Sequence, residues 1–216
     1  MALEVKICGV RTPAAVEAAA AGGARFVGLV FYARSPRRVD LATARGLADL
    51  ARARGLVPVG VHVDADDALL AATAPIVDWL QLHGAESPAR AAAIRARFDK
   101  PLIKAIAVAG KADLAAAAAY DGIVERILFD TRPPPGATRP GGHGVAFDWS
   151  LLADLALEIP WMLSGGLDAA CLAEAVATSG AWAVDVSSGV ETAPGEKNLD
   201  LIRAFLEAAR AIERGE

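Results

Sequence analysis

Two kinds of hydrophobic pattern alternate along the chain, short β-branched apolar runs and longer stretches rich in Ala, Leu and Arg. The short runs are typical of strands and the longer stretches of helices. Strands that are apolar almost throughout indicate a parallel sheet covered on both faces. The predicted strands are residues 3–8, 25–31, 56–63, 77–83, 101–107, 125–130, 160–164 and 182–187.

Capping residues mark where the helices between these strands begin and end. Thr12 and Pro13 open the stretch PAAVEAAAAGG as N-cap and first-turn proline. Asp40 precedes LATARGLADLARAR, which Gly55 ends. The last helical stretch, LDLIRAFLEAARAIER, follows Asn198. Strands and helices therefore alternate along the whole chain.

This alternation predicts the fold. Eight strands, each followed by a helix, are the elements of a (β/α)8 TIM barrel. We therefore predict an α/β protein with a parallel eight-stranded sheet, as a single domain over residues 1–216. A doubly wound open sheet is the competing topology. The long irregular stretch TRPPPGATRPGGHG, at 131–144, is predicted to be a lid or binding loop, because such loops in compact domains usually serve a function.

Composition narrows the classes of function. A hydrophobic content of 54% supports a large core, and a net charge of −4 argues against a nucleic-acid surface. No apolar run reaches the roughly 20 residues that span a bilayer, and the N-terminus does not resemble a secretion signal. The two cysteines lack the spacing of a zinc site or a disulfide framework. We expect a cytoplasmic protein, monomer or homodimer, with no metal, nucleic-acid or membrane partner.

Cys8 and Asp130 are the candidate catalytic residues, because active residues of TIM barrels gather where strands end. Cys8 ends the first predicted strand, and strand alternation places Lys6 on the same face. A nearby ammonium would favour a thiolate, although a buried cysteine is more often inert packing. Asp130 ends the sixth strand, where it could simply brace the loop. A carboxyl group partly desolvated at a barrel mouth can instead stay protonated near neutral pH.

Two small-residue turns follow the seventh and eighth strands, in LSGGLD and DVSSGVE. Such turns let several backbone N–H groups converge on an anion, and TIM barrels often bind phosphate there. We therefore expect a phosphate ester as substrate. The candidate phosphate ligands are Gly165, Gly166, Ser187, Ser188 and Gly189.

Other polar residues near strand ends are candidates for substrate contacts. Arg37, after the second strand, would point toward the mouth, where a guanidinium suits a substrate carboxylate. His62 and His83 each end a strand, where a structural, hydrogen-bonded role is the ordinary one. We nevertheless include His83, with Lys6 and Asp185, among the candidate contacts. Neither histidine has a partner at metal-binding spacing.

Several blocks of the chain are distinctive: KICGVRT, GLVFYARSPRRV, LQLHG, LFDT, GGHGVAFDWS, LSGGL and VDVSSGVE. In this order they resemble the phosphoribosylanthranilate isomerase family of tryptophan biosynthesis. The resemblance runs from Lys6 to about Asn198, which is essentially the whole chain. It implies a TIM barrel without metal or cofactor. The implied reaction converts N-(5-phosphoribosyl)anthranilate into 1-(2-carboxyphenylamino)-1-deoxyribulose 5-phosphate by an Amadori rearrangement.

The resemblance also implies roles for individual residues. Cys8 would be the general base and Asp130 the general acid. Arg37 would contact the anthranilate carboxylate, and Asp185 is a candidate contact to the sugar. The phosphate would lie on the two glycine-containing turns.

Two positions depart from the family pattern, and alternatives to the family reaction remain. GGHG has His143 where a small hydroxyl residue is usual, and GVHVD has His62 where an aromatic or apolar residue is common. Cys171, in AACLAEAV, is interpreted as mid-helix packing. The alternatives are another phosphosugar isomerase or synthase, and a phosphosugar-binding barrel without catalysis. Cys8 argues against the first, and the presence of both Cys8 and Asp130 argues against the second.

Overall fold

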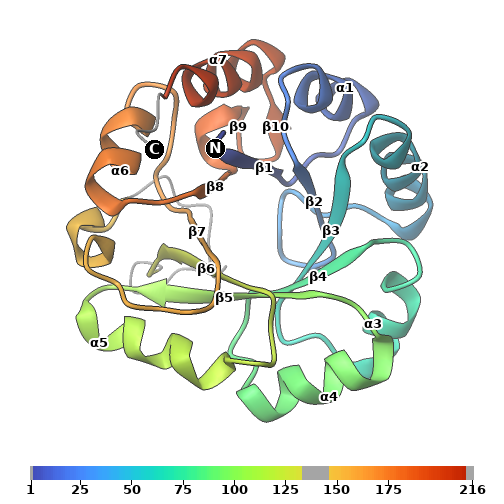
Figure 1. Cartoon of the computed structure of the whole chain (residues 1–216). Helices are drawn as coiled ribbons and strands as arrows, with labels where there is room; N and C mark the ends of the chain where they lie inside the picture. The colour runs from blue at the N-terminus through green and yellow to red at the C-terminus, as the bar shows by residue number, and fades with distance from the viewer. Residues whose placement is uncertain (1, 133–145, 213–216) are drawn as a thin grey trace.

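The computed structural model describes residues 2–132 and 146–212, and its central feature is a closed barrel of eight parallel strands in chain order. Each strand pairs with the next, and β8 closes the barrel onto β1 (Figure 1). The strands are β1 (Glu4–Cys8), β2 (Phe26–Val30), β3 (Val57–His62), β4 (Trp79–Leu82), β5 (Leu102–Val108), β6 (Arg126–Thr131), β7 (Trp161–Leu163) and β8 (Ala183–Val186). The predicted (β/α)8 barrel is confirmed, and only β5 and β6 run one residue past their predicted ranges.

Helices surround the barrel and begin where the capping residues predict. Thr12 accepts a hydrogen bond from the backbone N–H of Ala15, and Asp40 accepts one from Thr43. Asn198 caps the last helix. The α-helices are α1 (Pro13–Ala21), α2 (Leu41–Ala53), α3 (Asp67–Thr73), α4 (Pro88–Phe98), α5 (Lys111–Leu114), α6 (Leu172–Ser179) and α7 (Leu199–Ala211). Among the described residues, no helix is long and apolar enough to cross a membrane.

The described residues between β6 and β7 do not contain the α-helix that is expected after each strand. In the described part of the chain, β6 is followed by a 3-10 turn, η2 (Trp149–Leu152), and not by an α-helix. Pro160 disfavours helix in the residue before it, and residues 155–160 form no helix. A further 3-10 helix, η1 (Ala115–Tyr120), continues α5. Residues 133–145, which hold most of the predicted lid together with His143, lie outside the described residues.

The segments after β7 and β8 also differ from the sequence-based expectation. Cys171 is the N-cap of α6 and not a mid-helix residue, because Asp168 accepts hydrogen bonds from the backbone N–H groups of Ala170 and Cys171 and delays the helix start. After β8 come the 3-10 turn η3 (Ser188–Val190) and an unpredicted hairpin, β9 (Glu191–Ala193) with β10 (Glu196–Lys197). This hairpin places two charged residues close to the barrel mouth.

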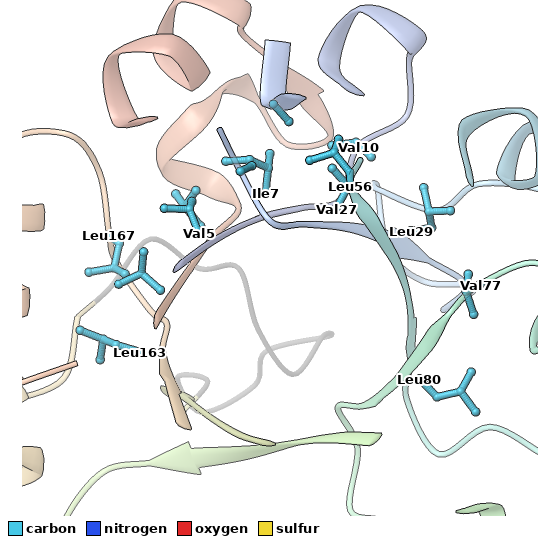
Figure 2. Close-up of a cluster of buried hydrophobic side chains, with 14 of the residues drawn as sticks. Val5, Ile7, Val10, Val27, Leu29, Leu56, Val77, Leu80, Leu163 and Leu167 are labelled. Carbon is cyan, nitrogen blue, oxygen red and sulfur yellow. The ribbon is translucent and has the colours of Figure 1, made fainter. Parts of the chain in front are cut away.

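Strand alternation divides the core into an outer and an inner part. Outward side chains such as Ile7, Val27 and Leu80 lie between the barrel and the helices, as Figure 2 shows. Inward side chains fill the barrel interior with a separate apolar cluster, which includes Phe26, Val59, Ile103, Ala105, Leu128 and Met162. Burial of both sets, at about 25 cal/mol per Å² of apolar surface, is the main force that closes the barrel.

Candidate active site

Cys8 and Lys6 share the inward face of β1 near the C-terminal mouth of the barrel, as alternation predicts. Both are buried, with Lys6 fully inaccessible to solvent. Both approach Gly28 of β2, the register partner of Cys8. A Cβ at Gly28 would lie 2.9 Å from the Cys8 sulfur and 3.2 Å from the Lys6 ammonium nitrogen. Glycine at this position therefore gives the thiol and the ammonium room to lie side by side.

Asp185 of β8 is the ion-pair partner of Lys6. The Lys6 ammonium donates to Oδ1 of Asp185 at 2.7 Å, and the Ser164 hydroxyl donates to Oδ2 at 3.3 Å. Burial, and next the negative charge of Asp185, raise the pKa of the Cys8 thiol, although Lys6 and Lys197 act in the opposite direction. Lys6 thus favours the thiolate as expected, but burial and Asp185 outweigh it. The thiol form predominates in the unliganded site.

Asp130 is the penultimate residue of β6, and its carboxylate lies inside the barrel mouth. Its Oδ1 accepts the backbone N–H of Thr131 at 2.8 Å, and its Oδ2 lies 3.2 Å from Nε2 of His83. The other ring nitrogen of His83 lies 2.8 Å from the amide nitrogen of Gln81, a fully buried residue of β4. Asp130 and His83 therefore come together at the mouth, although 47 residues separate them in the chain.

Arg37 lies beside Gly9, the residue after Cys8, but is already held by a carboxylate. Its side chain packs over Gly9, where an added Cβ would be 2.6 Å from Cδ of Arg37. Its Nε and Nη2 donate to the two carboxylate oxygens of Glu191 at 2.8 and 2.7 Å, a bidentate pair. Lys197 donates to the same carboxylate at 2.7 Å. Burial raises the pKa of Glu191, but the two cations outweigh it and hold that pKa below its usual value.

The two predicted phosphate turns lie next to each other and to Asp130. Gly165 and Gly166 have φ values of +89° and +69°, a conformation that glycine adopts without strain. A Cβ at Gly165 would be 3.1 Å from Oδ1 of Asp130, and one at Gly189 would be 1.9 Å from the carbonyl oxygen of Leu167. Lys197 donates to the carbonyl oxygen of Ser187 at 2.8 Å and so braces the second turn.

Comparison with known proteins decides the family. The model of the family "N-(5'phosphoribosyl)anthranilate (PRA) isomerase" matches residues 5–208. This chain belongs to the phosphoribosylanthranilate isomerase family. It is 57% identical to N-(5'-phosphoribosyl)anthranilate isomerase of Rhodopseudomonas palustris strain BisA53 over 216 residues, 99% of each chain.

Solved structures agree with the family assignment. Phosphoribosyl anthranilate isomerase of Thermotoga maritima is similar with a TM-score of 0.86 and 33% identity, over 97% of this chain and 100% of that one. A phosphoribosyl anthranilate isomerase in complex with reduced 1-(o-carboxyphenylamino)-1-deoxyribulose 5-phosphate is similar with a TM-score of 0.81 and 31% identity, over the same shares. The family, the fold and the isomerase function expected from the sequence are therefore confirmed. The roles of individual residues stay predictions.

His62, one of the two departures from the phosphoribosylanthranilate isomerase pattern, lies away from the mouth. Its side chain faces outward, stacks on Phe31 with ring centroids 5.3 Å apart, and has Nε2 2.9 Å from the Thr73 hydroxyl. Burial lowers its pKa to about 4. It is therefore a neutral histidine between barrel and helices, in agreement with the structural role expected for it.

Sequence reasoning missed three residues around this isomerase site. Glu191 stands at the end of the DVSSGVE motif, and its contact with Arg37 spans 154 positions of the chain. Gln81 alternates with His83 in LQLHG, a signal that could have identified it as inward-facing. Lys197 had no signal, because the hairpin that carries it was not predicted. Among the described residues, no group of three or more His, Cys, Asp or Glu side chains could hold a metal ion.

Proposed function

We propose that Cys8 and Asp130 are the general base and general acid with which this chain isomerises N-(5-phosphoribosyl)anthranilate. One observation carries the proposal: both side chains project into the mouth of the barrel, from β1 and β6, beside the two glycine-containing turns. An acid and a base at the C-terminal mouth fit an isomerisation that moves protons between oxygen and carbon.

The chemistry begins with the acid. Asp130 protonates the furanose ring oxygen, the C1–O bond breaks, and the anthranilate nitrogen shares its electron pair to form an iminium ion. That cation withdraws electrons from C2 and makes the C2 proton acidic. The Cys8 thiolate removes this proton, and the resulting enolamine tautomerises to the ketone. Because the iminium is the electron sink, the reaction needs no metal or cofactor.

Anchors at the two ends of the substrate hold the reacting carbon in place. The Glu191 carboxylate accepts hydrogen bonds from Nε and from one N–H of Nη2 of Arg37. A guanidinium has five N–H donors, so three remain. The remaining donors suit the anthranilate carboxylate. The turns at Gly165, Gly166, Ser187, Ser188 and Gly189 suit the phosphate, while Lys6 and Asp185 lie where the sugar would pass between the anchors. Such positioning supplies much of the rate enhancement of enzymes.

The charges around the mouth bear on how Cys8 becomes a base. The Lys6–Asp185 pair is neutral overall, whereas Arg37 and Lys197 share the single carboxylate of Glu191 and leave one positive charge over. The substrate carboxylate would neutralise that charge on binding, so the cation that favours the thiolate is the iminium formed when the ring opens. The proton of Cys8 would therefore leave for solvent most readily after Asp130 has opened the ring.

The test is a fluorescence assay on the EDTA-treated full chain, with phosphoribosylanthranilate generated in situ. Anthranilate-type fluorescence should decay with the wild-type protein. Cys8→Ala and Asp130→Asn should each lower kcat by about a hundredfold to ten-thousandfold, with KM little changed.

Cys171→Ala is the matched control, because it removes the other cysteine, whose sulfur contacts the carbonyl oxygen of Gly166 from behind the first phosphate turn and makes no contact with Cys8 or Asp130 among the described residues. It should keep the wild-type kcat. A wild-type rate for Cys8→Ala would exclude it as the base, and a change confined to KM in Asp130→Asn would exclude it as the acid. If no decay occurs although the phosphosugar binds, the chain is a binding barrel.

A further inference from the structure

A chain of three polar side chains runs from the barrel interior to the mouth. Gln81 is fully buried on the inward face of β4, between its register partners Val61 and Ile103. Its amide nitrogen lies 2.8 Å from Nδ1 of His83, and Nε2 of that ring lies 3.2 Å from Oδ2 of Asp130. The proposed acid is therefore connected through one imidazole to one buried amide.

The direction of these hydrogen bonds follows from the charge of Asp130. In the form of the site with Asp130 ionised and His83 neutral, the carboxylate only accepts, so Nε2 of His83 must carry the ring proton and Nδ1 must present a lone pair. Nδ1 then needs a donor, and the amide N–H of Gln81 supplies it. In this arrangement the amide oxygen of Gln81 is buried and has no hydrogen-bond partner among the described residues. An unsatisfied buried acceptor is costly and calls for a reason.

The acid form of the site supplies that reason. Oδ1 of Asp130 accepts a hydrogen bond from the backbone N–H of Thr131. A proton added to this carboxylate therefore binds to Oδ2, the oxygen that faces His83. With a proton on Oδ2, Nε2 must accept, and the ring proton has to sit on Nδ1. If the added proton stays on the ring as imidazolium, Nδ1 again carries hydrogen. Both forms need an acceptor at Nδ1, which the amide oxygen of Gln81 provides after a half-turn.

We propose that Gln81 is a positioning residue whose amide reverses as the Asp130–His83 pair gains and loses its catalytic proton. The proposal rests on the proposed function, in which Asp130 is the acid. The pair holds one proton in its base form and two in its acid form. The second proton goes to the substrate ring oxygen and is regained from solvent through the partly exposed His83. Glutamine suits this role because its amide both donates and accepts within one shape.

The test reads the ring protons of His83 directly. The full chain, labelled with 15N-histidine, has three histidines, and the His83 signals are those missing in His83→Asn. Wild type at alkaline pH should show Nε2 protonated and Nδ1 unprotonated. Gln81→Glu, whose carboxylate can only accept, should add hydrogen at Nδ1 at a pH at which Nδ1 of the wild type is unprotonated. Gln81→Leu, which can do neither, should keep Nε2 protonated at this pH, because the Asp130 carboxylate still accepts there.

Ile103→Val is the matched control, because it loosens packing in the same layer and removes no hydrogen bond. It should keep the wild-type tautomer. Gln81→Leu should lower kcat by on the order of a hundredfold with KM little changed, as loss of a residue that orients a catalytic group does. An Nδ1 that stays unprotonated in Gln81→Glu, or a wild-type kcat in Gln81→Leu, would overturn the proposal.

The tautomer measurement separates this proposal from the proposed function. If Asp130→Asn keeps its rate while Gln81→Glu adds hydrogen at Nδ1 of His83, Asp130 is not the acid, and reversal of the Gln81 amide serves no catalytic step. If Asp130→Asn is inactive and Nδ1 of His83 stays unprotonated in Gln81→Glu, the assignment of Asp130 as the acid stands and only the proposed role of Gln81 fails.

Discussion

Two buried lysine–carboxylate pairs lie in this barrel, one facing outward and one facing inward. On the outer side, Lys104 of β5 donates to Glu86 at 2.9 Å and to the carbonyl oxygens of Leu82 and Gly84 at 3.3 and 2.6 Å. Glu86 in turn accepts the backbone N–H groups of Asp64 and Gly84. Every donor of this ammonium has a partner, and the pair ties β5 to the loops after β3 and β4.

The inward pair, Lys6 with Asp185, has far fewer partners. Lys6 donates to one carboxylate oxygen at 2.7 Å and lies beside the thiol of Cys8, and Ser164 is the other donor to Asp185. No backbone group among the described residues donates to Asp185 or accepts from Lys6. A buried ion pair contributes little net stability unless its hydrogen bonds are complete. The outer pair therefore maintains structure, and the inner pair keeps bonding capacity for a ligand.

Replacing both members of each pair by apolar residues separates the two roles, and the outer pair should show the larger loss of stability. Lys104→Met/Glu86→Leu leaves the N–H groups of Asp64 and Gly84 and a loop carbonyl without partners. At about 1–3 kcal/mol for each of these three groups, the free energy of unfolding should fall by about 3–9 kcal/mol. Urea unfolding followed by circular dichroism measures this, and a wild-type midpoint would contradict the structural role.

The inner pair should show the reverse behaviour. Lys6→Met/Asp185→Leu should stay within about 1–2 kcal/mol of wild-type stability, because few hydrogen bonds are lost with the two charges. Its kcat/KM should nevertheless fall by on the order of a thousandfold, the scale of acid–base catalysis. Unfolding curves and the fluorescence assay on the same preparation check both parts. Normal turnover in this double variant would show that the inner pair has no catalytic part.

His62, which faces outward, should change the free energy of unfolding less than the outer lysine–carboxylate pair does. Burial lowers the pKa of His62 to about 4 from 6.5, so the unfolded chain binds more protons between these pH values. The stability that a neutral His62 allows is complete above pH 6.5 and is lost as the pH falls toward 4, by up to about 3 kcal/mol. His62→Gln should lack this loss. Equal pH dependence of urea midpoints in the two proteins would refute the assignment.

The sequence sufficed to predict features that depend on neighbouring residues. Strand alternation placed Lys6 and Cys8 on one inward face, and capping residues located helix starts at Thr12, Asp40 and Asn198. Each of these predictions uses contacts within a few positions of the chain. The late start of α6 at Cys171 escaped because an aspartate turn, rather than a hydrophobic pattern, determines it.

Features that depend on distant pairing could not be predicted in the same way. Asp185 was a candidate sugar contact, but its pairing with Lys6 spans 179 positions and changes how the charge of Lys6 acts on Cys8. Arg37 was predicted as a contact of the substrate carboxylate, and its partner Glu191 begins an unpredicted hairpin. Closure of the barrel brings these residues together, and the local sequence pattern does not predict contacts between such distant positions.

The most direct test of the central claim is the isotope effect of deuterium at ribose C2 on kcat of Cys8→Ser. If Cys8 removes the C2 proton, a poorer base at this position makes that step rate-limiting. Cys8→Ser should then show a normal primary isotope effect that is larger than the effect in Asp130→Asn, where ring opening limits the rate. An isotope effect of unity in Cys8→Ser, with turnover still impaired, would contradict the account, because Cys8 would then act on some other step.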